Sequence, residues 1–334
     1  PLRPERNALA NLSYTPTRLI NLQYSVWYSS NPTQKMNAGL IFTGEPPYRP
    51  STLNNDTFSN IILGGSKESM ELKELGATGV MIPEIGLGTW RYRGGTEPLR
   101  AGIELGAYLI DTAEGYGTEE IVGEAVSGMR DRVFIATKVS GRDLGHDRIL
   151  RAAEESLKRL GTDFIDLYQI HWPNSRYPMK ETMRAMETLV DRGIIRYIGV
   201  SNFDVEEMEE AVSALRNNPL VSNQVIYNLN SRYIEEDVLP YCIENDITVM
   251  AYTPLDDGNL TRVSRKASGK MVVLEEIAGE TDKTMAQVAL NWCTSGKNVI
   301  AIPKSDTVTR TVENCGASGW RLTPGQKKRL DSAF

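Results

Sequence analysis

The sequence is poor in the residues that build metal sites and disulfide frameworks. Its 334 residues include two histidines, His146 and His171, and no H-E-x-x-H motif, so a catalytic metal site would consist almost wholly of carboxylates. The three cysteines, Cys242, Cys293 and Cys315, are odd in number and show no C-x-x-C spacing. This pattern indicates free, buried thiols in a reducing compartment. We therefore expect no metal cofactor and no disulfide bond.

The sequence also lacks long apolar runs and an excess of basic residues. No run reaches the roughly 18 apolar residues that a membrane span needs, and the first residues lack the basic and apolar segments of a secretory signal. The net charge of −6 and the pI near 5.3 argue against a basic surface for nucleic acid or anionic membranes. We expect a cytoplasmic protein that binds neither nucleic acid nor membrane and is a monomer or a weak homo-oligomer.

The composition and the hydrophobic periodicity of the sequence change near residue 70. Residues 1–69 are rich in Asn, Ser, Thr and Pro and show no sustained period of 2 or 3.6, which is typical of a poorly ordered N-terminal extension. Residues 70–334 alternate short apolar runs with amphipathic helical patterns. We expect one regular domain over residues 70–334. The extension before it is either dispensable or a targeting or partner-binding arm.

Eight short apolar runs in the regular region are typical of buried parallel strands. They are GLGTW (86–90), YLIDTA (108–113), VFIATKV (133–139), FIDLYQIH (164–171), YIGVSN (197–202), VSNQVIYN (221–228), TVMAYTPL (248–255) and VIAIPKS (299–305). Helical patterns with apolar residues at i, i+3, i+4 and i+7 separate the runs. Eight strand-then-helix units predict an α/β fold, a (β/α)8 TIM barrel, for which about 250 residues is typical. The segments flanking GATG (76–79) predict a β-hairpin before the first strand.

A doubly wound parallel sheet is the alternative fold. Such a sheet would carry the dinucleotide-binding fingerprint G-x-G-x-x-G after a strand. The two candidate segments start at Gly86 and Gly115, but their sixth positions are Arg91 and Glu120 rather than glycine. The sequence therefore favours the barrel.

Polar residues close nearly every apolar run. Because the active site of a TIM barrel is built at the carboxyl ends of the strands, these residues are candidates for the site. They are Thr89 and Trp90, Asp111 and Thr112, Lys138, His171, Ser201 and Asn202, Gln224 and Asn228, Tyr252 and Thr253, and Lys304 and Ser305. An Asp, a Lys and a His that end three successive strands indicate a shared site rather than three solvated loop residues.

The residue types point to acid catalysis at a carbonyl group. A free tyrosine has a pKa of about 10, and a nearby ammonium group favours the phenolate and lowers that value. Lys138 would supply this charge to Tyr116, and Asp111 would keep the lysine protonated in an apolar pocket. His171 would position the carbonyl oxygen. We therefore expect Lys138 to lower the pKa of Tyr116.

These residues resemble the signature of the aldo-keto reductase family. The segment DTAEGYG (111–117) is followed by ATK ending at Lys138 and IHWP starting at Ile170, and IGVSNF (198–203) and AIPKS (301–305) resemble two later motifs. The resemblance covers residues 70–334. It implies a hairpin that closes the barrel bottom, an extended NADPH across the opposite mouth, and direct hydride transfer to an aldehyde or ketone. In the family's terms Asp111, Tyr116, Lys138 and His171 are catalytic, with Tyr116 as the general acid.

The resemblance also implies which residues hold the cofactor. Ser201, Asn202 and Gln224 would hold the carboxamide, and Tyr252 would stack on the nicotinamide ring, since amide, hydroxyl and aromatic groups match these parts. Lys304 and Arg310 would neutralise the 2′-phosphate, which favours NADPH over NADH. The full set expected to bind cofactor is Gly88, Thr89, Ser201, Asn202, Gln224, Tyr252, Thr253, Leu255, Lys304, Ser305, Arg310, Glu313 and Asn314.

Trp90 and Trp172 follow strand ends and are expected to line the substrate pocket; packing at the barrel edge is the alternative for Trp172. The chain continues only briefly past Thr323, which is expected to cap a last helix, so we expect an open site. In this respect the chain resembles small microbial reductases that act on diketo-gluconates, methylglyoxal and similar carbonyls.

Two other functions stay open. One is a subunit that binds the cofactor with little turnover, and the other is a barrel of unrelated chemistry such as a phosphate-sugar lyase.

Overall fold

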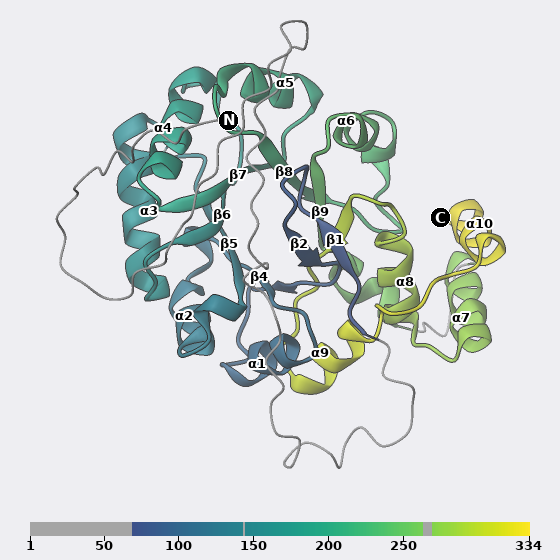
Figure 1. The fold of residues 1–334 in the computed structure, drawn as a ribbon. Coiled ribbons are helices and arrows are strands. Elements are labelled where there is room, and N and C mark those ends of the chain that lie inside the picture. Colours follow the sequence, from purple (N-terminus) through teal and green to yellow (C-terminus); the bar gives the residue numbers. More distant parts are fainter. Residues whose placement is uncertain (1–68, 143, 263–268) are drawn as a thin grey trace, which may run out of the picture. The chain divides into compact units, whose positions relative to one another are not determined.

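The computed structural model describes residues 69–142, 144–262 and 269–334. The expected N-terminal extension lies outside these residues, apart from Ser69. From residue 87 to the carboxyl end, each strand is followed by one or more helices (Figure 1). No helix in the described part of the chain is long and apolar enough to cross a bilayer.

Eight parallel strands form one sheet in sequence order (Figure 1). They are β3 (Leu87–Gly88), β4 (Leu109–Asp111), β5 (Phe134–Val139), β6 (Ile165–Ile170), β7 (Ile195–Ser201), β8 (Leu220–Ile226), β9 (Thr248–Tyr252) and β10 (Val299–Ala301). Each lies inside one of the eight predicted runs or overlaps it. Most of their residues are buried on both faces of the sheet, which explains why they read as apolar runs rather than as alternating patterns.

The sheet closes on itself between β10 and β3. The backbone N–H of Gly86 donates to Ala301 O at 2.8 Å, and that of Gly88 donates to Pro303 O at 3.1 Å. A Cβ atom on Gly88 would lie 2.5 Å from Ile302 O, so only glycine permits this approach. The closed ring confirms the predicted (β/α)8 barrel and excludes the doubly wound sheet.

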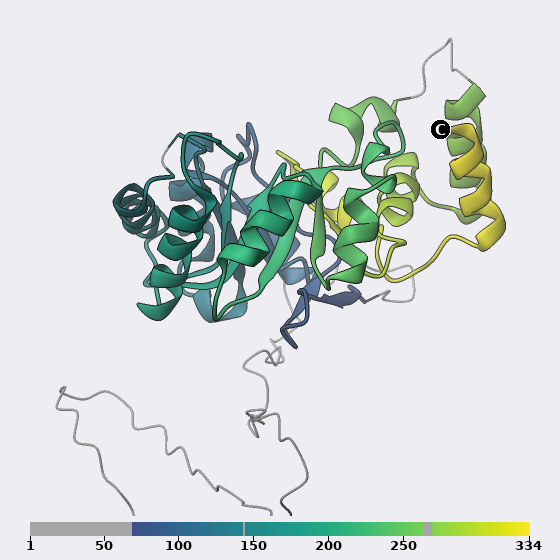
Figure 2. The ribbon, with the colours of Figure 1, turned by 90° about the horizontal axis from the view of Figure 1, so that it is seen from above.

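The helices that follow the strands surround the barrel (Figures 1 and 2). They are α1 (Glu97–Glu104), α2 (Glu119–Val126), α3 (His146–Leu160), α4 (Met179–Asp191), α5 (Val205–Ala214), α6 (Val238–Glu244), α8 (Met285–Cys293) and α9 (Val308–Cys315). In α3 the buried residues Ile149, Leu150, Ala153 and Leu160 share one stripe, and Gly161 ends the helix in the left-handed conformation.

Two further helices, α7 (Gly269–Thr281) and α10 (Pro324–Ala333), lie side by side beyond the ring (Figures 1 and 2). Arg329 of α10 forms ion pairs with Glu276 and Glu280 of α7. Thr323 caps α10 in a reciprocal arrangement with Gln326, as predicted from the sequence.

The predicted hairpin is present as β1 (Leu72–Glu74) and β2 (Met81–Pro83). Its residues Leu75 and Ile82 are fully buried and belong to a separate apolar cluster with inward-facing residues of the barrel, including Leu109 and Phe134. The hairpin therefore plugs the amino-terminal end of the barrel, opposite the ends where the polar residues lie.

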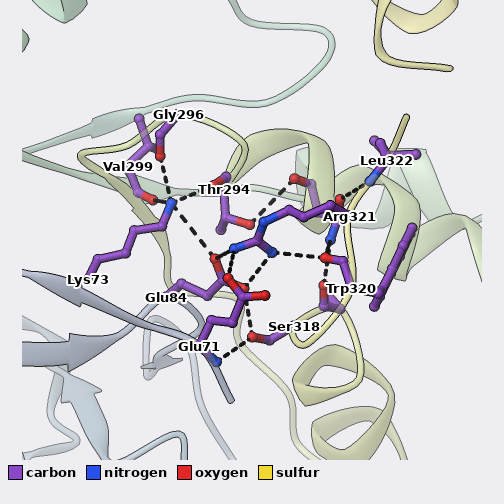
Figure 3. Close-up of polar contacts among 12 residues, drawn as sticks. Glu71, Lys73, Glu84, Thr294, Gly296, Val299, Ser318, Trp320, Arg321 and Leu322 are labelled. Carbon is purple, nitrogen blue, oxygen red and sulfur yellow. Dashed lines mark hydrogen bonds and ion pairs between the residues drawn. The ribbon is translucent and has the colours of Figure 1, made fainter. Parts of the chain in front are cut away.

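An ionic network fastens this hairpin to the carboxyl-terminal part of the chain (Figure 3). Lys73 donates to the carbonyl oxygens of Thr294, Gly296 and Val299, the last two at 2.6 and 2.7 Å. Burial lowers the pKa of Lys73 to about 8, although the nearby Glu84 carboxylate opposes this shift.

Glu84 is the acidic centre of the network and is fully buried. It accepts hydrogen bonds from Ser318 Oγ at 2.6 Å and from both terminal nitrogens of Arg321, at 3.0 and 2.8 Å (Figure 3). Arg321 also pairs with Glu71. Since a buried carboxylate is costly without such partners, the network depends on Arg321.

We expect Arg321→Met to lower the free energy of unfolding by about 2 kcal/mol, because Glu84 would lose its main cation while the arginine is itself partly exposed. Urea denaturation monitored by circular dichroism measures the change. Arg329→Met, which breaks only exposed ion pairs, is the matched control and should leave the curve nearly unchanged. Equal effects of the two variants would show that the buried network adds no stability.

Candidate active site

A cavity of about 800 Å³ lies at the carboxyl ends of the barrel strands. It brings together every residue expected to bind cofactor or substrate, and three of the four expected catalytic residues. These are Gly88, Thr89, Trp90, Asp111, Tyr116, His171, Trp172, Ser201, Asn202, Gln224, Tyr252, Thr253, Leu255, Lys304, Ser305, Arg310, Glu313 and Asn314. The exception is Lys138, which is fully buried and does not line the cavity.

Asp111 and Lys138 form a buried ion pair at the floor of this cavity. Asp111 is the last residue of β4, and Lys138 lies near the end of the neighbouring strand β5. Lys138 Nζ donates to Asp111 Oδ2 at 2.7 Å and to the carbonyl oxygen of Thr112 at 2.8 Å. The predicted partnership of the two residues is therefore present, and it holds an ammonium group where no solvent reaches.

Tyr116 lies above this pair, in a short 3-10 turn, η1 (Glu114–Tyr116), that follows β4. Its hydroxyl oxygen is 3.5 Å from Lys138 Nζ and 3.4 Å from His171 Nε2. Glu114 fastens the turn, because its carboxylate accepts the backbone N–H of Ser140 at 2.6 Å. The phenol thus sits between an ammonium group and an imidazole.

The net shift in the pKa of Tyr116 is opposite to the lowering expected from the sequence. Burial raises this pKa well above its usual value, and the Asp111 carboxylate adds to the increase. Lys138 does not reverse the effect, because burial lowers its own pKa and Asp111 neutralises much of its charge. The phenol therefore stays protonated near neutral pH, as a proton donor must.

His171 is neutral in this environment. Burial lowers its pKa to about 4, and the positive charge of Lys138 contributes to the same shift. Above that pH the ring has one protonated nitrogen and one free nitrogen. It can therefore form hydrogen bonds with a substrate oxygen without adding a positive charge.

The second carboxylate oxygen of Asp111 has amide partners. Gln224 Nε2 donates to Asp111 Oδ1 at 2.8 Å, and Gln169 Nε2 lies 3.4 Å from the same atom. Sequence reasoning missed Gln169, which lies inside an apolar run. The available signal was its position two residues before His171, since alternate residues of a strand share a face.

A chain of threonine hydroxyls supports the same strand ends. Thr89 Oγ1 donates to the carbonyl oxygen of Asp111 at 2.9 Å, and Thr118 lies within 3.0 Å of the hydroxyls of both Thr89 and Thr112. Thr118, at the start of α2, was also missed. It links the loop after β4 to Thr89, just after β3.

One side of the cavity is lined by a connected polar set. Tyr252 Oη donates to Asn202 Oδ1 at 2.9 Å, while Asn202 Nδ2 donates to Ser201 Oγ at 3.0 Å and to the carbonyl oxygen of His171 at 3.1 Å. Asn202 and Thr253 both have positive φ values, 62° and 51°. Such a conformation is rare for threonine, so the loop after β9 stores local strain at the cavity wall.

The far end of the cavity contains the residues around the start of α9. Lys304 pairs with Asp306, and Arg310 pairs with Glu313. Asn314 Nδ2 donates to Ser305 Oγ at 2.8 Å. Since Arg310 lies in the first turn of α9, its charge and the helix amino terminus favour an anion here.

No group of three or more metal-binding side chains occurs among the residues that the structure describes. Asp111 is already engaged by Lys138 and by two amides.

Comparison with known proteins identifies the family. The sequence pattern of the Aldo/keto reductase family matches residues 84–334, three quarters of the chain. The chain belongs to the aldo/keto reductase family. It is therefore an oxidoreductase of this family, with the fold and the residue motifs that the sequence resemblance implied.

Individual aldo/keto reductases align over most of their length. Methylglyoxal reductase YeaE of Escherichia coli (strain K12) is 42% identical over 268 residues, which cover 76% of this chain and 92% of that protein. Glyoxal reductase of Bacillus subtilis (strain 168) is 37% identical over 260 residues, covering 76% and 90%. The crystal structure of an aldo/keto reductase from Klebsiella pneumoniae in complex with NADP and acetate matches with a TM-score of 0.71 and 39% identity, covering 79% and 95%.

The environment of His171 gives a direct pH prediction. With a pKa of about 4, its ring stays neutral between roughly pH 5.5 and 8, so its NMR signals should not move over that range. The chain has only one other histidine, His146, so a His146→Asn variant assigns the two sets of signals. A His171 titration near pH 6.5 would show that burial and Lys138 do not act on this ring.

Proposed function

We propose that this chain reduces aldehydes and ketones to alcohols with NADPH, by direct hydride transfer and with Tyr116 as the general acid. The observation that carries the proposal is the position of the Tyr116 hydroxyl in the cavity, 3.5 Å from Lys138 Nζ and 3.4 Å from His171 Nε2. We further propose that residues 70–334 are the catalytic unit, because every site residue lies in this range.

The three groups have complementary roles in the proposed reaction. NADPH, when bound, would supply the hydride for the carbonyl carbon. Tyr116 donates its proton to the carbonyl oxygen, and Lys138 stabilises the phenolate that forms, which offsets the high pKa of the phenol. His171, being neutral, holds the carbonyl oxygen in line with Tyr116 by a hydrogen bond.

Asp111 acts through Lys138 in this proposal. Its carboxylate keeps the ammonium group charged in a place from which water is excluded. Without that partner, burial would favour the neutral amine, which cannot stabilise a phenolate.

The residues along the cavity fit an extended dinucleotide. Ser201, Asn202 and Gln224 would bind the carboxamide, and the ring of Tyr252 would stack on the nicotinamide. Glu313 and Asn314 would contact the adenine. The backbone and side chains of Gly88, Thr89, Thr253 and Leu255 line the cavity between the two ends.

Lys304, Ser305 and Arg310 would bind the 2′-phosphate that distinguishes NADPH from NADH. In the structure both cations are paired with Asp306 and Glu313, so the phosphate would replace these carboxylates as their partner. The NADP complex of the relative from Klebsiella pneumoniae supports this choice of cofactor.

The substrate is proposed to be a small carbonyl compound. Trp90 and Trp172 line the cavity and are 51% and 53% exposed, so two apolar faces stand open beside the catalytic groups. The ring centroids of Trp90 and Tyr116 lie 4.8 Å apart, so an apolar wall stands beside the phenol ring. The names of relatives that reduce methylglyoxal and glyoxal support small aldehydes as the first substrates to test.

The test of Tyr116 follows the absorbance of NADPH with a panel of small aldehydes and ketones. We expect Tyr116→Phe to lower kcat by about 10² to 10⁴, the usual contribution of a general acid, while NADPH still binds. Tyr177→Phe removes a hydroxyl that donates to the carbonyl oxygen of Arg142 and does not line the cavity, so it should leave the rate unchanged.

Two outcomes would contradict the proposal. NADPH binding with no oxidation by any carbonyl would identify a cofactor-binding subunit instead. Equal use of NADH with the best substrate would show that Lys304 and Arg310 do not select the 2′-phosphate.

A further inference from the structure

The two carboxylate oxygens of Asp111 have different hydrogen-bond partners. Oδ2 receives the Lys138 ammonium group at 2.7 Å, and Oδ1 faces the amides of Gln224 and Gln169. The two amides also contact one another, with Gln224 Nε2 lying 3.4 Å from Gln169 Oε1. All four side chains are buried, although Asp111 and Gln224 also line the cavity.

Gln169 is positioned by the strands on both sides of it. It lies on β6, in register with Lys138 on β5 and with Gly199 on β7. A Cβ atom on Gly199 would lie 3.0 Å from Gln169 Cγ and 2.4 Å from Ser222 Oγ. The missing side chain of Gly199 therefore makes the room in which the longer side chain of Gln169 reaches Asp111.

A residue that only filled this space would be apolar. Burying a primary amide in the barrel interior is unfavourable unless its polar atoms find partners. The partners available to Gln169 are Asp111 and Gln224. The amide group of Gln169 thus serves as a hydrogen-bond partner of Asp111, the carboxylate that holds Lys138.

Gln169 and Gln224 differ in their access to the cavity. Gln224 lines the cavity, whereas Gln169 does not. Under the proposed function, on which this inference rests, the Gln224 amide binds the cofactor carboxamide. When Gln224 turns to the cofactor, Gln169 is the amide that remains beside Asp111 Oδ1.

We propose that Gln169 is a positioning residue that donates to Asp111 Oδ1 when cofactor occupies Gln224. It acts through Asp111 and Lys138 and touches neither substrate nor cofactor. Its contribution therefore falls on the chemical step in the cofactor-bound enzyme and not on the affinity for NADPH.

A comparison of two shape-conserving variants tests whether Gln169 affects the chemical step rather than the affinity for NADPH. In Gln169→Met, we expect the single-turnover rate of NADPH oxidation to fall about tenfold, as for the loss of one hydrogen bond to a charged group, with the Kd for NADPH within about twofold of the parent. In Gln224→Met, we expect the Kd for NADPH to rise about tenfold, because this amide binds the cofactor. Thermal unfolding of both variants checks that the barrel is intact.

A parent-like single-turnover rate in Gln169→Met overturns the proposal, because methionine fills the same space without the amide. A loss shared equally between rate and NADPH affinity also overturns it. A crystal structure of the NADPH complex decides the point without turnover: Gln224 should leave Asp111, and Gln169 Nε2 should remain within hydrogen-bonding distance of Oδ1. If NADPH binds but no carbonyl is reduced, the proposed function fails, and this structure still supports or contradicts the exchange of partners.

Discussion

The buried ion pair between Asp111 and Lys138 is the interaction on which the site depends. Removing two charges from water is costly, and their attraction alone does not ensure a net gain. The barrel offsets the cost by adding the carbonyl oxygen of Thr112 to the ammonium group and two amides to the carboxylate. Neighbouring parallel strands deliver these groups because their carboxyl ends open on the same mouth.

Burial shifts the pKa values of Tyr116 and His171 in opposite directions. It raises the pKa of Tyr116 and lowers that of His171, since in both cases the neutral form is favoured. Near neutral pH the site thus offers a protonated phenol beside an uncharged imidazole. In the proposed reaction, Lys138 contributes most once the phenol begins to lose its proton, because only then does a negative charge lie 3.5 Å from the ammonium nitrogen.

Much of this arrangement could be predicted from the sequence. The eight strands were found because two-sided burial makes each a short apolar run. Many residues that line the cavity were predicted because polar side chains close those runs. Gln169 was missed because it lies within such a run, where a polar residue gives no boundary signal. The pKa of Tyr116 was misjudged because residue types reveal the nearby charge of Lys138 but not the depth of burial, which has the larger effect.

A double-mutant cycle tests most directly whether the ion pair acts as one unit. The measurement is kcat/KM for NADPH-dependent reduction of the best small aldehyde by the parent, Asp111→Asn, Lys138→Met and the double variant. If Asp111 acts only through Lys138, each single variant should lose about as much activity as the double variant. Losses that add in free energy would contradict this account, because they would show that the two residues contribute to the reaction independently.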